Sequence, residues 1–299
     1  MLEDLKLGSK YDGFLFLAES VRNPPWLGSH HHVELELNLV VNGSVTYVVG
    51  GRRFRFGRGT LLWMFPAQEH QLVDRSDDAQ YYVAVFKPGL IRRSCHSRPY
   101  RDLRRKRIDC DGVLHALLDP NSFDLVRRTM DGLMEESLDP DLLNREAGFG
   151  IGSGFSFKHG DPDGLNAGLH HLLLLCWRCQ RKGSDTGREV ALHPAVSRAL
   201  QILGEEENEM ALSHLARRCG VSPAYLSRTF HRQIGVPLSR YRNSVRLSRF
   251  WTKYRGSTRL TLAEAVYASG FGSYAQFYKI FTQAYGRGPR ECLKPAENS

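Results

Sequence analysis

The chain is poor in cysteine, and its cysteines are widely scattered. Six of its 299 residues are cysteines, too few and too far apart for the disulfide framework of a small secreted domain. Cys176 and Cys179 have the spacing of a metal or redox pair, but no second pair accompanies them and the surrounding pattern is helical. We therefore expect buried structural thiols at these two positions.

Membrane-spanning and targeting segments are also lacking. The longest aliphatic run, residues 172–175, is far shorter than the roughly 18 apolar residues of a membrane span. The first residues are mixed and acidic, without the basic and apolar regions of a signal peptide. The sequence therefore predicts a cytoplasmic protein with no membrane partner.

Excess positive charge is confined to the last third of the chain. Residues 190–299 contain 16 Lys and Arg against 7 Asp and Glu, whereas residues 1–189 contain 25 of each sign. A neutral domain joined to a basic one suggests a sensor or an enzyme carried on a polyanion-binding module. A solvated basic face would have the same composition, so charge alone does not decide.

Residues 12–87 have the pattern of short, closely spaced β-strands. Alternation of apolar and polar residues over 32–39 has period 2. Asn42-Gly43 lies between two β-rich runs and predicts a hairpin, and Gly50-Gly51 predicts a second tight turn. Such strands favour a small barrel or sandwich.

The stretch from residue 88 to the linker is expected to be basic and irregular at first and helical later. Residues 88–120, with four consecutive basic residues at 104–107, predict a solvated loop or exposed strand rather than a separate nucleic-acid site. Residues 122–138 and 163–182 predict helices that cover the barrel or pair two subunits. Residues 183–189 are a plausible interdomain linker.

Two segments of the last third, 212–235 and 262–286, repeat each other. Their glycines are offset by 50 positions and the apolar residues that follow by 51. Each copy has the helix, turn, helix pattern whose second helix can enter a major groove. The residues that this pattern needs are the turn glycines Gly220 and Gly270, the N-caps Ser222 and Ser273, and the capping box Thr261–Glu264.

A basic helix is expected between the two copies. Residues 237–253 carry Arg240, Arg242, Arg246, Arg249 and Lys253. Such a helix suits phosphate contact, although a solvated charged face accounts for some of these side chains equally well.

Residues 193–292 resemble the DNA-binding domain of AraC/XylS-type bacterial transcription regulators. The most specific motif is Ala265-Val266-x-x-Ser269-Gly270-Phe271-x-Ser273-x-x-x-Phe277-x-Lys279-x-Phe281-x-x-x-Tyr285-Gly286-x-Gly288-Pro289-Arg290. The chain departs from the family pattern at Ala211, where a capping Ser or Thr is common. It departs again at Glu291-Cys292, where an aromatic-Arg pair is usual.

This resemblance implies that each monomer places two recognition helices in successive major grooves on one face of promoter DNA. It implies base contacts by Arg228 to guanine, Gln276 to adenine and Ala224 to a thymine methyl group. The full set of candidate DNA-binding residues is Ala224, Ser227, Arg228 and Arg232 in the first copy and Tyr274, Ala275, Gln276 and Lys279 in the second.

The N-terminal region resembles the cupin superfamily. His30-x-His32-x-x-x-Glu36, followed by Gly43, is similar to the first cupin motif, and Gly59, Pro66 and His70 form a looser second one. The resemblance implies a divalent metal such as Fe, Mn, Zn or Ni inside the barrel. The implied ligands are His30, His32, Glu36 and His70. Gln68 stands where glycine is usual, and the polar side of a half-buried strand would show the same residues.

Without a metal, the barrel interior is the expected pocket for a small-molecule effector. Its candidate lining residues are Tyr47, Trp63 and Tyr82. No nucleophile elbow, phosphate loop or carboxylate pair for acid-base work is found, so no enzyme is expected.

The sequence thus predicts a two-domain transcription regulator. Residues 1–182 are expected to form a cupin-like β-barrel with appended helices, and residues 190–299 an all-α tandem helix-turn-helix domain. Expected partners are double-stranded promoter DNA, a small-molecule effector, a second copy bound through residues 163–181, and RNA polymerase if the protein activates transcription. The alternatives are a metal-dependent cupin enzyme with a DNA-binding tail, and a non-specific nucleic-acid binder.

Overall fold

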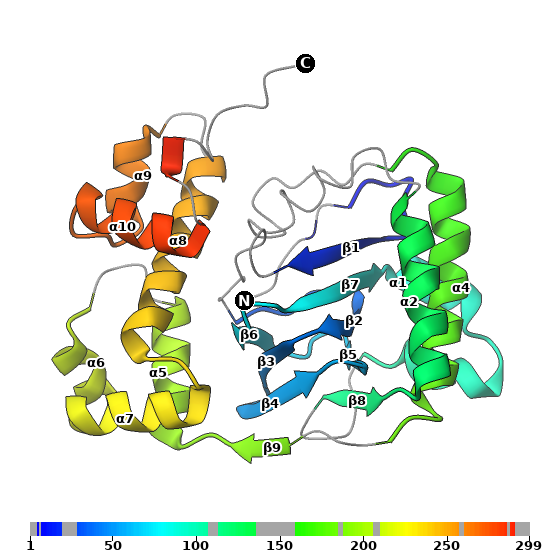
Figure 1. Cartoon of the computed structure of the whole chain (residues 1–299), viewed down its shortest axis with the longest axis horizontal. Coiled ribbons are helices and arrows are strands. Elements are labelled where there is room, and N and C mark those ends of the chain that lie inside the picture. Colours follow the sequence, from blue (N-terminus) through cyan, green and yellow to red (C-terminus); the bar gives the residue numbers. More distant parts are fainter. Residues whose placement is uncertain are drawn as a thin grey trace.

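The computed structural model describes residues 5, 7–19, 29–106, 113–135, 159–184, 188–205, 210–256, 260–285 and 288–290. Within these ranges the chain forms an N-terminal domain of two β-sheets with helices, and a C-terminal helical domain (Figure 1). The predicted combination of a cupin-like domain and a helical domain is confirmed. The domain boundaries stay predictions.

The N-terminal domain contains two antiparallel sheets that face each other. The first has the order β1-β7-β2-β5-β8 and the second the order β6-β3-β4-β9. Their strands are β1 (Gly13–Glu19), β2 (Leu35–Asn42), β3 (Ser44–Val49), β4 (Arg52–Gly57), β5 (Thr60–Met64), β6 (His70–Arg75), β7 (Gln80–Phe86), β8 (Leu114–Leu117) and β9 (Arg188–Ala191). The sheets remain separate among the described residues, so the predicted barrel is an open one.

The prediction of a hairpin at Asn42-Gly43 was wrong. The strand before it, β2, pairs with β5 and β7, whereas the strand after it, β3, pairs with β4 and β6. The chain therefore crosses from one sheet to the other at Gly43, which has φ +62° and packs against Ser76 and Asp78. The second predicted turn, Gly50-Gly51, does join the paired strands β3 and β4.

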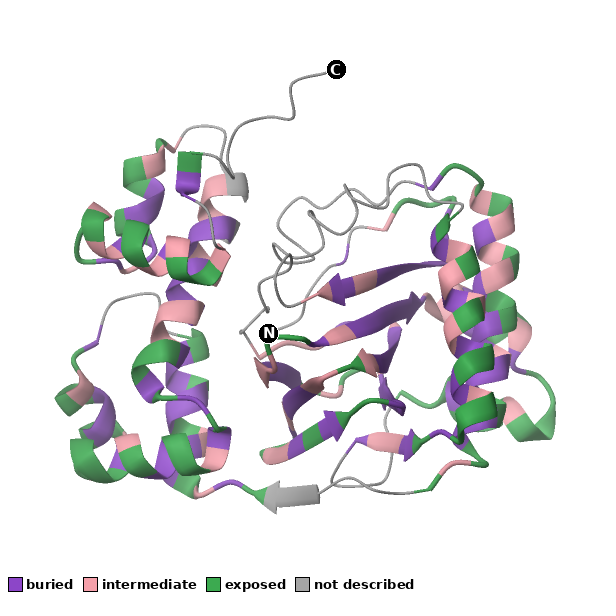
Figure 2. Ribbon diagram, viewed as in Figure 1, coloured by how far each residue is buried: buried purple, intermediate pink, exposed green. Residues whose placement is uncertain are grey.

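Helices cover the outer face of the first sheet. They are α1 (Pro88–Ser94), the 3₁₀ helix η1 (Arg98–Arg104), α2 (Pro120–Glu135) and α4 (Pro162–Gln180). The Trp63 ring of β5 meets the Trp177 ring of α4 edge to face, with centroids 5.5 Å apart. Figure 2 shows that the strands are largely buried while α2 and α4 are buried along one stripe. Both sheet faces are thus covered, which explains why six successive residues of β2 are buried.

The C-terminal domain consists of two helical units joined by one long helix. Its helices are α5 (Pro194–Glu205), α6 (Leu212–Arg218), α7 (Pro223–Ile234), α8 (Leu238–Gly256), α9 (Leu262–Ala268) and α10 (Tyr274–Tyr285). Tyr241 and Val245 of α8 belong to the core of the first unit, and Phe250 and Trp251 to that of the second. None of the helices in the described part of the chain combines the length and apolar composition that crossing a bilayer requires.

The outer face of the second sheet packs against the C-terminal domain. Val48 and Val73 join the apolar core of the first helical unit. The Gln71 side-chain amide of β6 donates a hydrogen bond to the hydroxyl of Tyr241 on α8, and both side chains are buried. The two domains are therefore in direct contact as well as linked through β9, which pairs with β4.

Candidate nucleic-acid interface and sensor site

The first helix-turn-helix is formed by α6 and α7, and its sequence dictates the turn. Gly220 has φ +71°, a left-handed conformation that glycine adopts without steric cost. The Ser222 hydroxyl accepts a hydrogen bond from the backbone N–H of Tyr225 at 3.3 Å, and Pro223 occupies the first turn of α7. Gly235 ends α7 with φ +93°. The predicted turn and cap are thus confirmed.

The solvent-facing side of α7 carries the predicted DNA-binding residues. Leu226 and Phe230 are fully buried and fix the opposite side of the helix. Ala224 and Arg228 are exposed and Ser227 is half-buried, with the 3- and 4-residue spacing of one helix face. Arg232 is also exposed, nearer the end of the helix.

The second helix-turn-helix, α9 and α10, repeats this construction. Gly270 has φ +86°, and the capping box of Thr261 and Glu264 forms as predicted. The Ser273 hydroxyl accepts a hydrogen bond from the backbone N–H of Gln276 at 3.1 Å. Phe277 and Phe281 are fully buried and fix the inner face of α10.

The predicted residues of α10 do not all share one environment. Ala275 and Lys279 are exposed. Tyr274 is half-buried and packs against the core of its unit. The Gln276 side-chain oxygen accepts a hydrogen bond from the backbone N–H of Gly272 at 2.9 Å. Gln276 thus helps to close the turn, a role that the sequence alone did not indicate.

Two exposed residues were missed by the sequence analysis. His231 continues the face of Ala224 and Arg228 by another turn of α7, and Tyr278 precedes Lys279 on α10 and is 49% exposed. The sequence contained both signals. The offset of 51 that relates Ala224 to Ala275 and Arg228 to Lys279 also makes Tyr278 the equivalent of Ser227. His231 follows Arg228 by three positions on the same helix face.

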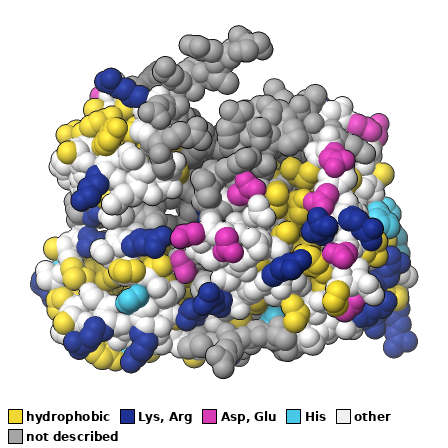
Figure 3. Space-filling model, viewed as in Figure 1, with side chains coloured by type: hydrophobic (Ala, Val, Ile, Leu, Met, Phe, Trp, Pro, Cys, Tyr) yellow, Lys and Arg dark blue, Asp and Glu magenta, His cyan; other side chains and the backbone are white. Residues whose placement is uncertain are grey.

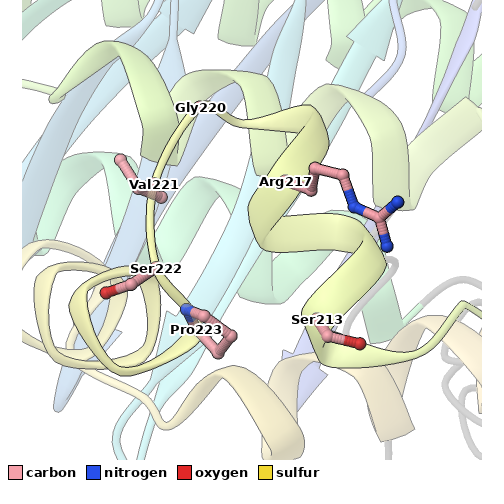
Figure 4. Close-up of a pocket in the computed structure, with 6 residues that line it drawn as sticks. All are labelled: Ser213, Arg217, Gly220, Val221, Ser222 and Pro223. Atoms are coloured by element: carbon pink, nitrogen blue, oxygen red, sulfur yellow. The ribbon is translucent and has the colours of Figure 1, made fainter.

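An open groove of about 590 Å³ lies beside the first turn. Figure 4 shows Ser213 and Arg217 one helical turn apart on α6, with Val221 and Ser222 across the groove on the turn; Gly220 and Pro223 complete its lining. Arg217 is exposed. In Figure 4 the Arg217 guanidinium group extends outward from α6, away from Val221 and Ser222, so it is available to an anion such as a phosphate at the outer edge of the groove.

Most arginines of α8 form contacts within the protein. The Arg242 guanidinium donates a hydrogen bond to the Met210 carbonyl, and that of Arg249 donates one to the Leu203 carbonyl at 2.5 Å. Arg246 is only 8% exposed. These contacts tie α8 to Met210, just before α6, and to α5, and they differ from the phosphate contacts considered for this helix.

In the N-terminal domain, the four candidate metal ligands come together between the sheets. Ligand nitrogens of His30, His32 and His70 lie within 4.8 Å of one another. A carboxylate oxygen of Glu36 lies 3.0 Å from His32 Nε2 and 3.6 Å from His70 Nε2. Except for the half-buried His30, these side chains are buried.

The hydrogen bonds of this cluster define what it can hold. Nδ1 of His32 lies 3.1 Å from the Glu34 carbonyl and Nδ1 of His70 lies 2.9 Å from the Gln68 carbonyl, so both Nδ1 atoms act as donors. The Nε2 atoms then point at the cluster, which is the orientation of metal-ligating histidines. The cluster residues therefore fit a divalent metal.

A proton can occupy the same place between His32 and Glu36. Since Nδ1 of His32 already donates, its Nε2 must also carry a proton to bond the carboxylate. Burial alone would lower the pKa of His32, but the hydrogen bond and charge of Glu36 outweigh it and raise that pKa. Burial alone would likewise raise the pKa of Glu36, yet its bonds to the two histidines bring it well below the usual value.

The predicted effector residues lie on different faces. Tyr47 is buried between the sheets, and burial, followed by the charges of Tyr81 and Glu36, raises its pKa well above the usual value. Trp63 lies on the opposite face of its sheet, against α4. Tyr82 donates a hydrogen bond to Asp131 of α2 on that same outer face.

Pairing between strands identifies which other side chains face inward. Asn38 is on the same face of β2 as Glu36 and donates a hydrogen bond to it at 2.7 Å. Val40, two positions further along that face, pairs with Tyr81 of β7. Tyr81 is buried and approaches Arg75. The inner face therefore presents polar side chains from β2, β3, β6 and β7.

Family models match both domains of the chain. The model of an AraC-like ligand-binding domain matches residues 20–149, and the model of a helix-turn-helix domain matches residues 215–294. The first spans β2 to β8 with α1, η1 and α2, and the second spans α7 to α10. No curated protein matches the chain.

Several solved structures are similar to this chain at low identity. ToxT from Vibrio cholerae is 12% identical with a TM-score of 0.35, and the match covers 93% of this chain and 96% of that one. ToxT from Vibrio cholerae strain SCE256, with a bound unsaturated fatty acid, gives 12% identity, a TM-score of 0.36 and 93% of each chain. The AraC-like transcriptional activator CuxR gives 13% identity, a TM-score of 0.28, and 77% of this chain and 70% of its own.

Proposed function

The chain is an AraC-type regulator of transcription that responds to a ligand, and from that premise we propose how its side chains read DNA and how the N-terminal domain controls them. We propose that α7 and α10 enter two successive major grooves on one face of promoter DNA. The observation that carries this proposal is the pair of matching exposed faces, Ala224 with Arg228 on α7 and Ala275 with Lys279 on α10.

In this proposal, some residues of the recognition helices contact bases and residues beside them contact the phosphate backbone. Arg228 bonds a guanine through O6 and N7, and Lys279 reads a base or a phosphate at the equivalent place of the second site. His231 and Tyr278 extend the two contact faces. Ser213 and Arg217 in the groove beside the first turn hold the phosphate backbone and set the register of α7.

The effector is proposed to bind between the two sheets. Tyr47 and Tyr81 offer hydroxyl groups there, Asn38 an amide and Glu36 a carboxylate, and these suit a small polar or cationic molecule with an apolar part. Trp63 and Tyr82 have no part in this proposal, since both face the helices.

Strand β6 is proposed to carry the signal to the DNA-binding domain. His70 points into the inner cluster, and the next residue, Gln71, points outward to Tyr241 of α8. Beside this contact, Gly235 at the end of α7 lies against Arg53 and Asp74 of the second sheet. A ligand that shifts β6 therefore changes the contact that fixes α8, and α8 spans both recognition units.

Site selection from random duplex DNA with the full chain tests this function. The proposal predicts enrichment of sites with two short blocks, centred about 10 base pairs apart because that is one helical turn. A chain that retains DNA without enriching any sequence would instead be a non-specific binder, with affinity set by salt alone.

A second candidate function is a metal-dependent cupin enzyme with a DNA-binding tail, and the three-histidine cluster is what favours it. A divalent metal held by His30, His32, His70 and Glu36 would supply Lewis acidity when bound. We propose a regulatory role for the cluster, in which metal or proton occupancy alters β6.

Metal analysis separates these two roles. Equimolar metal that falls in His70→Ala, together with a change in DNA affinity on chelation, supports the regulatory role. Equimolar metal whose removal leaves DNA affinity unchanged favours the enzyme.

Two further partners belong to this proposal. We propose that α4 pairs two copies of the chain and that RNA polymerase is contacted if the regulator is an activator. Light scattering of the full chain with and without DNA tests the pairing, since a dimer doubles the measured mass.

A further inference from the structure

The N-terminal domain carries a line of arginines that neither the DNA-binding face nor the inner cluster uses. It lies on η1, whose sequence is Arg98-Pro99-Tyr100-Arg101-Asp102-Leu103-Arg104. A 3₁₀ helix has three residues per turn, so side chains three positions apart are aligned. Arg98, Arg101 and Arg104 therefore form one row, with about 6 Å between successive positions from a rise of about 2 Å per residue.

Burial of the Tyr100–Leu103 row, on the inner side of η1, agrees with this alignment. All three arginines of the row are exposed, whereas Leu103 is 1% exposed and Tyr100 is half-buried. The indole N–H of Trp177 on α4 donates a hydrogen bond to the Pro99 carbonyl at 2.8 Å. The row is thus displayed on a helix anchored to the domain core.

The row is the centre of a larger basic surface. Residues 88–106 contain seven Lys and Arg but one acidic residue, Asp102, which pairs with Arg105 at 3.0 Å. Arg93 pairs with Asp12. The remaining basic residues of this surface, Arg92, Arg98, Arg101, Arg104 and Lys106, are all exposed.

This surface lies away from the DNA-binding domain. Figure 1 places α1 and the helices of the N-terminal domain on the side opposite α5 to α10, and Figure 3 shows Lys and Arg side chains gathered along that edge. A polyanion held here would lie on the opposite side of the molecule from α7 and α10. Any polyanion held here is a second one, or a distant part of the same molecule.

The chemistry of the surface favours nucleic acid over a folded protein. Protein interfaces usually contain buried apolar or aromatic anchors. Of the large apolar side chains that are exposed in the described residues, none lies in 88–106. A straight row of regularly spaced guanidinium groups instead matches a strand of regularly repeated phosphates, which arginine binds through paired hydrogen bonds.

We propose that the Arg98–Arg101–Arg104 row binds the phosphate backbone of a second DNA segment, so that one chain holds two segments of duplex. The specific segment is held by the C-terminal domain and the second, without sequence preference, by the row. A regulator bound at one site would thereby bring a distant stretch of the same DNA close to it, with the gain expected from two linked binding sites.

A bridging assay with the full chain tests the proposal. Random-sequence duplex is fixed to beads, protein is added, and capture of a second, fluorescent 30-base-pair duplex is measured over a range of salt. Wild type should capture the second duplex, and R98Q/R101Q/R104Q should capture at least tenfold less of it. The slope of log affinity against log salt for the second duplex should become shallower by roughly 2 to 3 units, about 0.9 for each lost phosphate contact.

A matched variant and the first duplex provide the controls. Arg58→Gln/Arg128→Gln/Lys182→Gln removes the same charge at three exposed positions of the same domain and should capture normally. Retention of protein on the bead duplex, which reports the C-terminal domain, should be unchanged in both variants. If the wild-type protein is not retained on the bead duplex, the proposed DNA-binding function is refuted, and the bridging proposal is not the part that failed.

Three results would overturn the proposal. Wild type that stays on the bead duplex without capturing a second one would do so. So would equal capture by the row variant, because the second duplex would then be held by the other C-terminal domain of a dimer. Binding of anionic vesicles through the row, with no capture of duplex, would reassign the surface to a membrane.

Discussion

Replacement of Arg228 by alanine should separate DNA recognition from folding. Arg228 is exposed on α7, and its guanidinium group makes no hydrogen bond or ion pair with the residues that the structure describes. Its removal should therefore change the free energy of unfolding by at most about 0.5 kcal/mol, as at ordinary surface positions. Chemical denaturation of both proteins measures this.

The same substitution should have a large effect on DNA affinity. A bidentate arginine–guanine contact contributes about 1–3 kcal/mol of discrimination. At about 1.4 kcal/mol per tenfold change, the affinity for the selected site should fall roughly 5- to 150-fold. Fluorescence anisotropy on the selected site and on its single-base variants gives both the loss and the position at which specificity relaxes.

Two further variants make the reasoning refutable. Arg228→Lys keeps the charge but cannot form the paired hydrogen bonds, so it should retain non-specific affinity and still lose discrimination at one base pair. Arg181→Ala, exposed at the end of α4, removes equal charge from the other domain and should leave recognition intact. An unchanged base preference in Arg228→Ala, with the protein folded, would refute the assigned contact.

The other predictions concern the domain contact, the inner cluster and the turn. A double-mutant cycle of Gln71→Leu and Tyr241→Phe should give a coupling of about 0.5–1.5 kcal/mol in urea unfolding, the contribution of one hydrogen bond; additive effects would show that the domains are not joined there. Glu36→Gln should destabilise the protein by about 1–3 kcal/mol near pH 6. Because the folded pKa of Glu36 lies below its usual 4.5, that stabilisation is present above pH 4.5 and lost as the pH falls through the folded value. A penalty independent of pH would contradict this origin. Gly220→Ala should cost about 1–2 kcal/mol, since φ is +71° and no atom lies within 4 Å of the added methyl group. Gly204→Ala, which is helical and equally open, should instead be neutral or stabilising, and equal effects in the two variants would rule out backbone strain.

The C-terminal domain was predictable because its determinants are local. A turn glycine, a capping hydroxyl and two apolar residues four positions apart fix each helix pair within about 20 residues, as at Gly220, Ser222, Leu226 and Phe230. The role of Gln276 was not predictable in this way, because its bond to Gly272 depends on the geometry of the closed turn.

The N-terminal domain was less predictable because its strands are buried on both faces. The residues of β5 are all buried, so the apolar pattern does not show which of them face the inner cluster. The pairing of Leu37 with Trp63, on the face opposite to Glu36, and the contact of Trp63 with Trp177 place Trp63 outside. The histidine cluster was predicted through the resemblance to the two cupin motifs, because His30, His32 and Glu36 match the first motif and His70 the second, and the structure brings these side chains together.

Spacing of the two half-sites tests the central claim most directly. Once a selected site is known, five base pairs are inserted between its two blocks, which turns the second block to the opposite face of the duplex, since a turn is about 10 base pairs. Because α8 joins the two recognition units as one helix, we predict that affinity falls at least tenfold and that Lys279→Ala then has no further effect on it. Unchanged affinity after the insertion would contradict the claim that α7 and α10 read successive grooves on one face.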